Sequence, residues 1–137
     1  MSNKNLETTK FLFRAFDDGD IPAILDRLAH DVQWEYGPVS HDVPWYQNRV
    51  GIESVNEFFR GMSETPMTRF EPTKFIAEGD TVVVLLQASY TVRSTGKNVV
   101  YNDAVMIWKF NEDGKVTKFA HRVDTHQAWL AFHGKNA

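Results

Sequence analysis

The chain has 137 residues, of which 42% are hydrophobic and 24% charged, values typical of one globular domain with a core. Its 15 basic and 18 acidic residues give a net charge of -3 without any basic run, so nucleic acid is not an expected partner. The absence of cysteine excludes disulfides, a thiolate nucleophile and a cysteine metal site. The first five residues lack the apolar run that a secretory signal would have, and the longest apolar run, residues 82–86, cannot span a bilayer. We therefore expect a cytoplasmic protein with no membrane partner.

The first part of the chain predicts two helices. Apolar residues recur at helical spacing between Leu6 and Phe16, and Gly19 interrupts the pattern. Asp20 is suited to cap a second helix that carries Pro22 in its first turn. The apolar stripe of this second helix consists of Ile24, Leu25 and Leu28.

A short strand, an irregular loop and a third helix follow. Apolar and polar residues alternate over residues 32–36, which predicts a strand. Residues 37–50 are predicted to form a loop that contains two large aromatic residues, Trp45 and Tyr46, so this loop should cover an apolar surface or pack on a partner. Apolar residues over 52–64 repeat at helical spacing, which predicts the third helix. The residues that break regular structure in the loop are Gly37, Pro38, His41, Pro44 and Asn48.

Turn signals divide the second half of the chain into strands. They lie at residues 78–80, 94–98 and 111–115, each with a glycine suited to a hairpin. Asp124 begins a last helix that ends at Gly134. We expect one α+β domain over residues 1–137, with a strongly curved, mixed or antiparallel sheet wrapped over three N-terminal helices into a cone with a pocket, and a short C-terminal helix. The predicted strands cover residues 68–78, 81–93, 98–110 and 115–123.

This order of elements resembles the cone-shaped fold of the nuclear transport factor 2-like superfamily, and three stretches resemble its SnoaL-like, ketosteroid isomerase-related branch. The resemblance covers nearly the whole chain. It implies a fold shared by steroid isomerases, polyketide cyclases, dehydratases, epoxide hydrolases and non-catalytic binding modules, so function has to be argued from residues. The three stretches are Phe16-Asp17-Asp18-Gly19-Asp20; Pro44-Trp45-Tyr46 with Gly51-Ile52-Glu53-Ser54-Val55 and Phe58-Phe59; and Phe110 through Asp113-Gly114-Lys115-Val116 to His121-Arg122-Val123-Asp124-Thr125.

Asp124 is the main candidate for catalysis. In the polyketide cyclase branch, a carboxylate at this place removes a proton alpha to a carbonyl, so the resemblance implies a general base at Asp124. An aspartate directly before a helix is equally an ordinary N-cap. His121 would polarise a carbonyl or exchange protons with Asp124, or is instead a surface or dimer-interface histidine. Strand alternation places Arg122 on the face of Asp124 and His121 on the other face, unless a bulge intervenes.

Aromatic residues and one strand face are the candidates for ligand binding. Trp34, Tyr36, Trp45 and Tyr46 are expected around the mouth of the pocket, where they would stack on a flat apolar ligand or pack as ordinary core. Asn102, Ala104, Met106 and Trp108 share a strand face, and the resemblance implies that this face lines the cavity, with Asn102 as a hydrogen-bond donor. Met106 and Trp108 are equally suited to plain core, and Arg122 is a further candidate. The opposite face carries Tyr101, Asp103, Val105 and Ile107, which is apolar enough to predict a homodimer.

The chain also departs from characterised members of the resembling family. The base position of steroid isomerases holds Tyr36 here, the oxyanion aspartate position holds Met106, and the helix-one tyrosine position holds Leu12 or Phe13, so we expect no steroid isomerase activity of that type. The Arg/Asp/Asp relay of limonene-type epoxide hydrolases is not visible. The five histidines are scattered and no glycine loop suits a phosphate, so we expect no metal and no cofactor.

Three hypotheses remain open at this stage. The first is a cofactor-free isomerase, cyclase or lyase that acts on an apolar, carbonyl-bearing small molecule, with Asp124 as base and with His121, Tyr36 or Asn102 stabilising the enolate oxygen. The second is a non-catalytic module that binds a small hydrophobic molecule. The third is a dimeric interaction domain whose cavity is filled by its own side chains.

Overall fold

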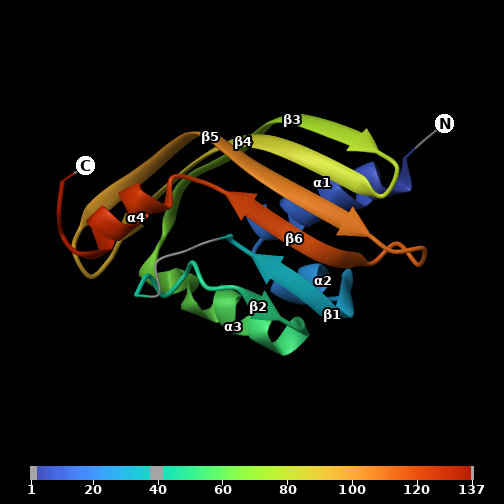
Figure 1. Ribbon diagram of the computed structural model, residues 1–137, viewed down its shortest axis with the longest axis horizontal. Helices are drawn as coiled ribbons and strands as arrows, with labels where there is room; N and C mark the ends of the chain where they lie inside the picture. The colour runs from blue at the N-terminus through green and yellow to red at the C-terminus, as the bar shows by residue number, and fades with distance from the viewer. Residues whose placement is uncertain (1–2, 38–41, 137) are drawn as a thin grey trace.

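The computed structural model describes residues 3–37 and 42–136, and within them one curved sheet is covered on its inner face by helices (Figure 1). The helices are α1 (Lys4–Asp17), α2 (Ile21–Leu25), α3 (Ile52–Arg60) and α4 (Thr125–Phe132), with a 3-10 helix, η1 (Gly61–Glu64). The strands are β1 (Leu28–Glu35), β2 (Arg49–Val50), β3 (Met67–Glu78), β4 (Thr81–Val92), β5 (Lys97–Phe110) and β6 (Val116–Arg122).

The sheet is mixed, and its order is β2-β1-β6-β5-β4-β3. Consecutive hairpins make β3 to β6 antiparallel, whereas β1 pairs with β6 in parallel, so the first and last long strands lie side by side. The predicted fold class is confirmed, including the curved sheet over N-terminal helices and the short final helix. None of the helices among the described residues has the length and hydropathy that crossing a bilayer requires.

Three boundaries differ from the sequence prediction. Leu28 begins β1 instead of ending the second helix, because α2 stops at Leu25. The third helix changes to the 3-10 form after Arg60. The two-residue strand β2, which pairs with Gln33 and Trp34 of β1, was not predicted. Pro38 and His41, two of the predicted loop residues, lie outside the described residues.

Bulges bend the long strands over the helices. Between β4 and β5 the register shifts at Gln87, because Asn102 and Asp103 together face this one residue. A second shift lies between β3 and β4 beside Pro72. Extra residues of this kind bend a strand and increase its twist, which lets the sheet curl around the helices. Side chains beyond the bulge change face, and this determines which residues of β5 reach the interior.

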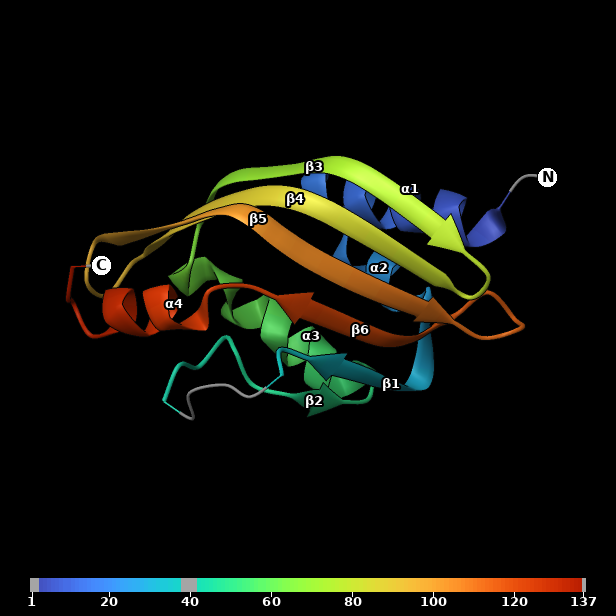
Figure 2. The same ribbon diagram turned by 45° about the horizontal axis from the view of Figure 1, so that its top comes forward.

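The helix α4 closes the end of the sheet where β5 outruns β6 (Figure 2). The Gln127 side chain accepts a hydrogen bond from the Val100 backbone nitrogen at 2.7 Å and donates one to the Val100 carbonyl at 3.0 Å. It thereby satisfies backbone groups that a neighbouring strand would otherwise pair. On its other side, α4 contacts the loop before β2 through the Phe132 and Trp45 rings, whose centroids lie 5.6 Å apart.

Candidate functional site

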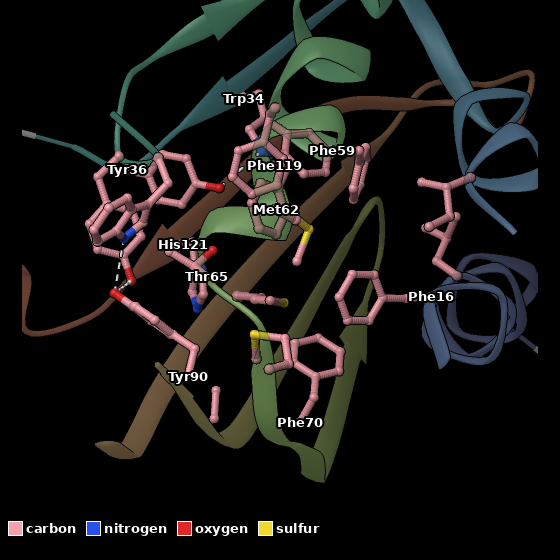
Figure 3. Close-up of a pocket in the computed structure, with 18 of the residues that line it drawn as sticks. Phe16, Trp34, Tyr36, Phe59, Met62, Thr65, Phe70, Tyr90, Phe119 and His121 are labelled. Carbon is pink, nitrogen blue, oxygen red and sulfur yellow. Dashed lines mark hydrogen bonds between the residues drawn. The ribbon is translucent and has the colours of Figure 1, made fainter. Parts of the chain in front are cut away.

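A cavity of about 110 Å³ lies between the inner face of the sheet and the helices α1 and α3 (Figure 3). A single water needs about 10–15 Å³ by this kind of measure, so the space far exceeds a packing defect. Figure 3 shows Tyr36, His121 and Tyr90 on one side of the space and Phe16 and Phe70 on the other. The lining side chains are mainly aromatic and aliphatic. They come from all the helices except α4, from the loop before β2 and from every strand except β2.

Three neighbouring strands build one aromatic wall of the cavity. Phe119 of β6 lies beside Trp34 of β1 in the parallel register and opposite Trp108 of β5 in the antiparallel one. The ring centroid of Phe119 is 4.0 Å from that of Trp34 and 4.6 Å from that of Trp108. Such a wall offers a large apolar surface on which a flat ring can stack.

Two nitrogen atoms of cavity-lining residues, Trp108 Nε1 and His121 Nε2, are buried and have no hydrogen-bond partner among the described residues. Both residues line the cavity, and His121 stands opposite Met106 in the β5–β6 pairing. A buried polar group without a partner costs about 1–3 kcal/mol. Most buried polar atoms in proteins are paired, so these two nitrogens, which belong to cavity-lining residues, are the candidates for a partner that a ligand would supply.

His121 is uncharged at neutral pH. Burial, with a smaller contribution from the positive charge of Arg122, lowers the pKa of His121 from 6.5 to about 3. A neutral imidazole has one donor nitrogen and one acceptor nitrogen, so His121 can give or accept a hydrogen bond but brings no charge into the cavity.

Tyrosine hydroxyls, together with the hydroxyl of Thr65, supply the other polar groups of the cavity. Those of Tyr46, Tyr90 and Tyr101 gather in one cluster, which also receives a hydrogen bond from Trp45 Nε1. The Tyr36 hydroxyl instead accepts a hydrogen bond from Trp34 Nε1 at 3.2 Å. Burial raises the pKa of all four phenols, so they remain protonated at neutral pH.

Most of the predicted site residues, six ligand-binding candidates and the catalytic candidate His121, line the cavity. The aromatic pairs of β1 and of the loop do so, and so do two of the predicted residues of β5 and the histidine of β6. These residues are Trp34, Tyr36, Trp45, Tyr46, Met106, Trp108 and His121.

Asp124 lies elsewhere, and the expectation that the last strand delivers a carboxylate into the cavity is wrong. Asp124 is exposed, and its Oδ1 accepts a hydrogen bond from the backbone nitrogen of Gln127 at 3.2 Å, as the N-cap of α4. Of the cavity-lining residues that the structure describes, none carries a carboxylate. The alternative interpretation of Asp124 as a helix cap is the one that the geometry supports.

Asn102 and Arg122 also point away from the cavity. The bulge in β5 leaves Asn102 exposed and turns Tyr101 inward, with Ala104, Met106 and Trp108, so the predicted facing of Asn102 and Tyr101 is wrong. Arg122 is exposed as well, and its guanidinium lies against Gly37. The two are so close that a Cβ atom added at Gly37 would lie 3.3 Å from Arg122 Nη1.

The sequence interpretation missed several cavity residues. Tyr90 follows the inward alternation of Val82, Val84, Leu86 and Ala88 along β4, a signal that was readable in the sequence. Tyr101 had no such signal, because the bulge reverses its face. The remaining missed residues are apolar side chains of the helices and the inner sheet, such as Phe16, Phe58, Phe59, Phe70 and Phe119.

A model of the SnoaL-like domain matches residues 10–119, which is most of the chain. The chain belongs to the SnoaL-like domain family. No functionally curated protein matches this SnoaL-like domain.

Solved structures similar to this SnoaL-like domain span almost its whole length. A nuclear transport factor 2-like protein of unknown function from Burkholderia pseudomallei is 26% identical with a TM-score of 0.84, and the alignment covers 96% of this chain and 98% of that one. A nuclear transport factor 2-like protein from Burkholderia xenovorans is 27% identical with a TM-score of 0.83, at the same coverage. TerC, co-crystallised with polyporic acid, is 25% identical with a TM-score of 0.81, covering 96% of this chain and 99% of that one.

The cap role of Asp124 in this SnoaL-like domain predicts a specific pattern of stabilities. Asp124→Ala should lower the free energy of unfolding by about 1 kcal/mol, because the Gln127 nitrogen loses its acceptor. Asp124→Asn should stay close to the wild type, since asparagine caps as well as aspartate. Urea denaturation at pH 7 measures both values, and equal losses in the two variants would show that the charge matters and the cap does not.

The burial of His121 predicts how stability depends on pH. Between pH 6.5 and about 3 the unfolded chain protonates this histidine and the folded chain does not, so the free energy of unfolding falls as pH falls. From pH 7 to pH 5 this one group should remove about 2 kcal/mol. Urea denaturation at both pH values should show that loss in the wild type and in His30→Gln, an exposed control that retains His121, but not in His121→Gln. An identical change in all three proteins would rule out the buried neutral imidazole.

Proposed function

We propose that this SnoaL-like domain binds a flat, apolar, ring-containing small molecule that carries an oxygen acceptor. The ring stacks on the wall formed by Trp34, Trp108 and Phe119, and the oxygen accepts a hydrogen bond from Trp108 Nε1 beside His121 Nε2. The observation that carries the proposal is these two buried, unpartnered nitrogens in residues that line a mainly apolar cavity.

The physical balance of the site favours such a ligand. Apolar walls supply affinity, and a few placed polar groups fix orientation. A ligand oxygen that accepts from Trp108 Nε1 would recover the cost of leaving that nitrogen unpaired, which a plain hydrocarbon cannot do. TerC, which was crystallised with polyporic acid, supports a small organic molecule as the partner.

Binding without turnover is better supported than the isomerase, cyclase or lyase hypothesis. That hypothesis needs a base with a pKa near the working pH. Asp124 is exposed and occupied as a helix cap, and the pKa of His121 lies near 3, which makes its imidazole a weak base. No other group with a suitable pKa stands among the described lining residues.

Fluorescence titration tests the proposed binding directly, because Trp34, Trp45 and Trp108 line the cavity. Polyporic acid should quench the tryptophan emission of the wild type in a saturable manner. Trp108→Phe keeps an aromatic ring but removes the Nε1 donor, and should weaken binding about tenfold. The matched control is Trp129→Phe, which changes a tryptophan of α4 outside the cavity and should bind as the wild type does. Unchanged affinity in Trp108→Phe, or no saturable quenching at all, would refute the proposal.

We further propose that the domain forms a homodimer through the outer face of its sheet. Ile76, Val83 and Ile107 are cross-strand neighbours there, and Ile76 is 46% exposed. An apolar row of this kind suits an interface between copies. Tyr101, which the sequence placed on this face, contributes nothing to it.

Sedimentation velocity at micromolar concentration should give a dimer for the wild type and a monomer for Ile76→Lys/Ile107→Lys, because the two lysines would have to be buried at the interface. Val50→Lys, at a 69% exposed position on β2, is the control that should stay dimeric. A monomeric wild type would exclude this assembly.

A further inference from the structure

The hydroxyl group of Tyr36 has a partner for its oxygen but none for its hydrogen. Trp34 Nε1 donates to the Tyr36 oxygen at 3.2 Å, so the phenol is the acceptor in this bond. A hydroxyl can accept and donate at the same time, and among the described residues nothing takes the hydrogen of Tyr36. Tyr36 lines the cavity and is only 3% exposed, so bulk water does not supply the missing acceptor.

The rings packed around Tyr36 do not accept this hydrogen. Their centroids lie 5.0 to 6.3 Å from that of Tyr36, and they belong to Tyr46, Phe58, Phe119 and His121. The two phenylalanines have no polar atom. The Tyr46 hydroxyl is bonded to two other tyrosines at 2.9 and 3.1 Å, and His121 Nε2 has no partner. The hydrogen of Tyr36 is therefore left for a molecule inside the cavity.

This hydrogen is a well-positioned donor. The bond from Trp34 Nε1 restricts rotation of the Tyr36 hydroxyl, because turning it would break that bond. Hydrogen bonds that run in series polarise one another, so the bond from Trp34 makes Tyr36 a stronger donor than an isolated phenol. Burial raises the pKa of Tyr36, so the hydroxyl keeps its hydrogen at neutral pH.

Trp34 connects this donor to the wall on which the ligand stacks. Its Nε1 contacts the Tyr36 hydroxyl, and its ring centroid lies 4.0 Å from that of Phe119 and 6.0 Å from that of Trp108. Figure 3 shows Trp34, Phe119 and Tyr36 on the same side of the space. The two donors, Tyr36 and Trp108, thus flank one indole ring, and a flat molecule stacked on that ring lies beside both.

We propose that Tyr36 is a second hydrogen-bond donor to the ligand, held in position by Trp34, and that the ligand carries two oxygen acceptors on one flat ring system. One oxygen accepts from Trp108 Nε1 and the other from the Tyr36 hydroxyl. Neutral carbonyl oxygens suit both places, because the cavity offers no charge to balance an anion. This inference rests on the proposed function, since it assigns the class of molecule that the same cavity binds.

The test of Tyr36 starts from a variant that lacks Trp34. In Tyr36→Phe alone, Trp34 Nε1 would lose its acceptor and could replace Tyr36 as the donor. The pair to compare is therefore Trp34→Phe, which keeps the Tyr36 hydroxyl, and Trp34→Phe/Tyr36→Phe, which has neither donor. The probes are 1,4-naphthoquinone and naphthalene, flat molecules of similar size that differ in the two oxygens. The lack of cysteine removes the thiols that would trap a quinone.

The second substitution should weaken binding of the quinone about tenfold, the contribution expected of one buried hydrogen bond. Binding of naphthalene should not change, because it has no oxygen to hold. Quenching of Trp45 and Trp108, which line the cavity in both variants, reports the quinone, and competition with the quinone reports naphthalene. The control is Trp34→Phe/Gln33→Ala, which changes an exposed residue of β1 and should leave both affinities as in Trp34→Phe.

The possible outcomes separate this inference from the proposed function. Equal quinone affinity in Trp34→Phe and Trp34→Phe/Tyr36→Phe would overturn the role of Tyr36, while a loss in Trp108→Phe would still support the proposed function. Equal losses for quinone and naphthalene would also overturn the role, because they would reveal a change of cavity shape. A quinone that does not quench the wild type at millimolar concentration overturns the inference, whereas saturable quenching by polyporic acid would keep the proposed function.

Infrared spectra of the wild-type complex provide a test that needs no variant. Both carbonyl stretches of bound 1,4-naphthoquinone should lie at lower frequency than in an apolar solvent, because both oxygens accept hydrogen bonds. One shifted and one unshifted stretch would overturn the second donor and leave the first in place.

Discussion

Asn102 and Asp103 of β5 lie opposite a single residue of β4, Gln87, and the chemistry of the cavity depends on this one extra residue. Without it, strict alternation would place Tyr101 on the outside whenever Met106 and Trp108 face inward. Because of the bulge, the side chains of Tyr101 and Trp108, on either side of it, both face inward. One strand therefore supplies an indole donor at one end and a phenol at the other, and the same irregularity bends the sheet around the helices.

The cavity combines a low-polarity wall with polar groups that carry no charge. Burial keeps His121 neutral and the tyrosines protonated, so each polar group offers a dipole and none offers a formal charge. Such an interior suits neutral carbonyl or hydroxyl oxygens, whereas a carboxylate or a phosphate would have to give up its hydration without a counter-charge. Membership of the SnoaL-like family accounts for the fold of the domain, whereas the residues that line the cavity set its chemistry.

Much of the fold was predictable because local signals and global structure agree. Gly79, Gly96 and Gly114 all adopt positive φ at the hairpin turns, as the turn sequences indicated, and Asn3 and Asp20 cap the helices that follow them. The inward alternation of β4 is regular over its whole length. These features arise from neighbours in sequence, so periodicity and turn chemistry can reveal them.

The site was less predictable, for two physical reasons. A bulge leaves no trace in hydrophobic periodicity, since Tyr101 and Asn102 are both acceptable on either face of a strand, and the exchange of their faces could not be read. An aspartate before a helix has the same sequence signature whether it caps the helix or acts on a substrate, so Asp124 needed coordinates to decide. Trp108 Nε1 and His121 Nε2 lack hydrogen-bond partners because of how the folded chain packs around them, and no sequence pattern reveals this.

The two hydrogen bonds between the Gln127 side chain and the Val100 backbone have a role outside the cavity. Where β6 ends, β5 continues with its backbone amide and carbonyl turned outward, the arrangement on which a foreign strand could add itself to the sheet. The Gln127 side chain makes the two hydrogen bonds that such a strand would make to Val100, so these backbone groups are already paired. The final helix therefore also covers a strand edge that could otherwise pair with another chain, and this role does not depend on what the cavity binds.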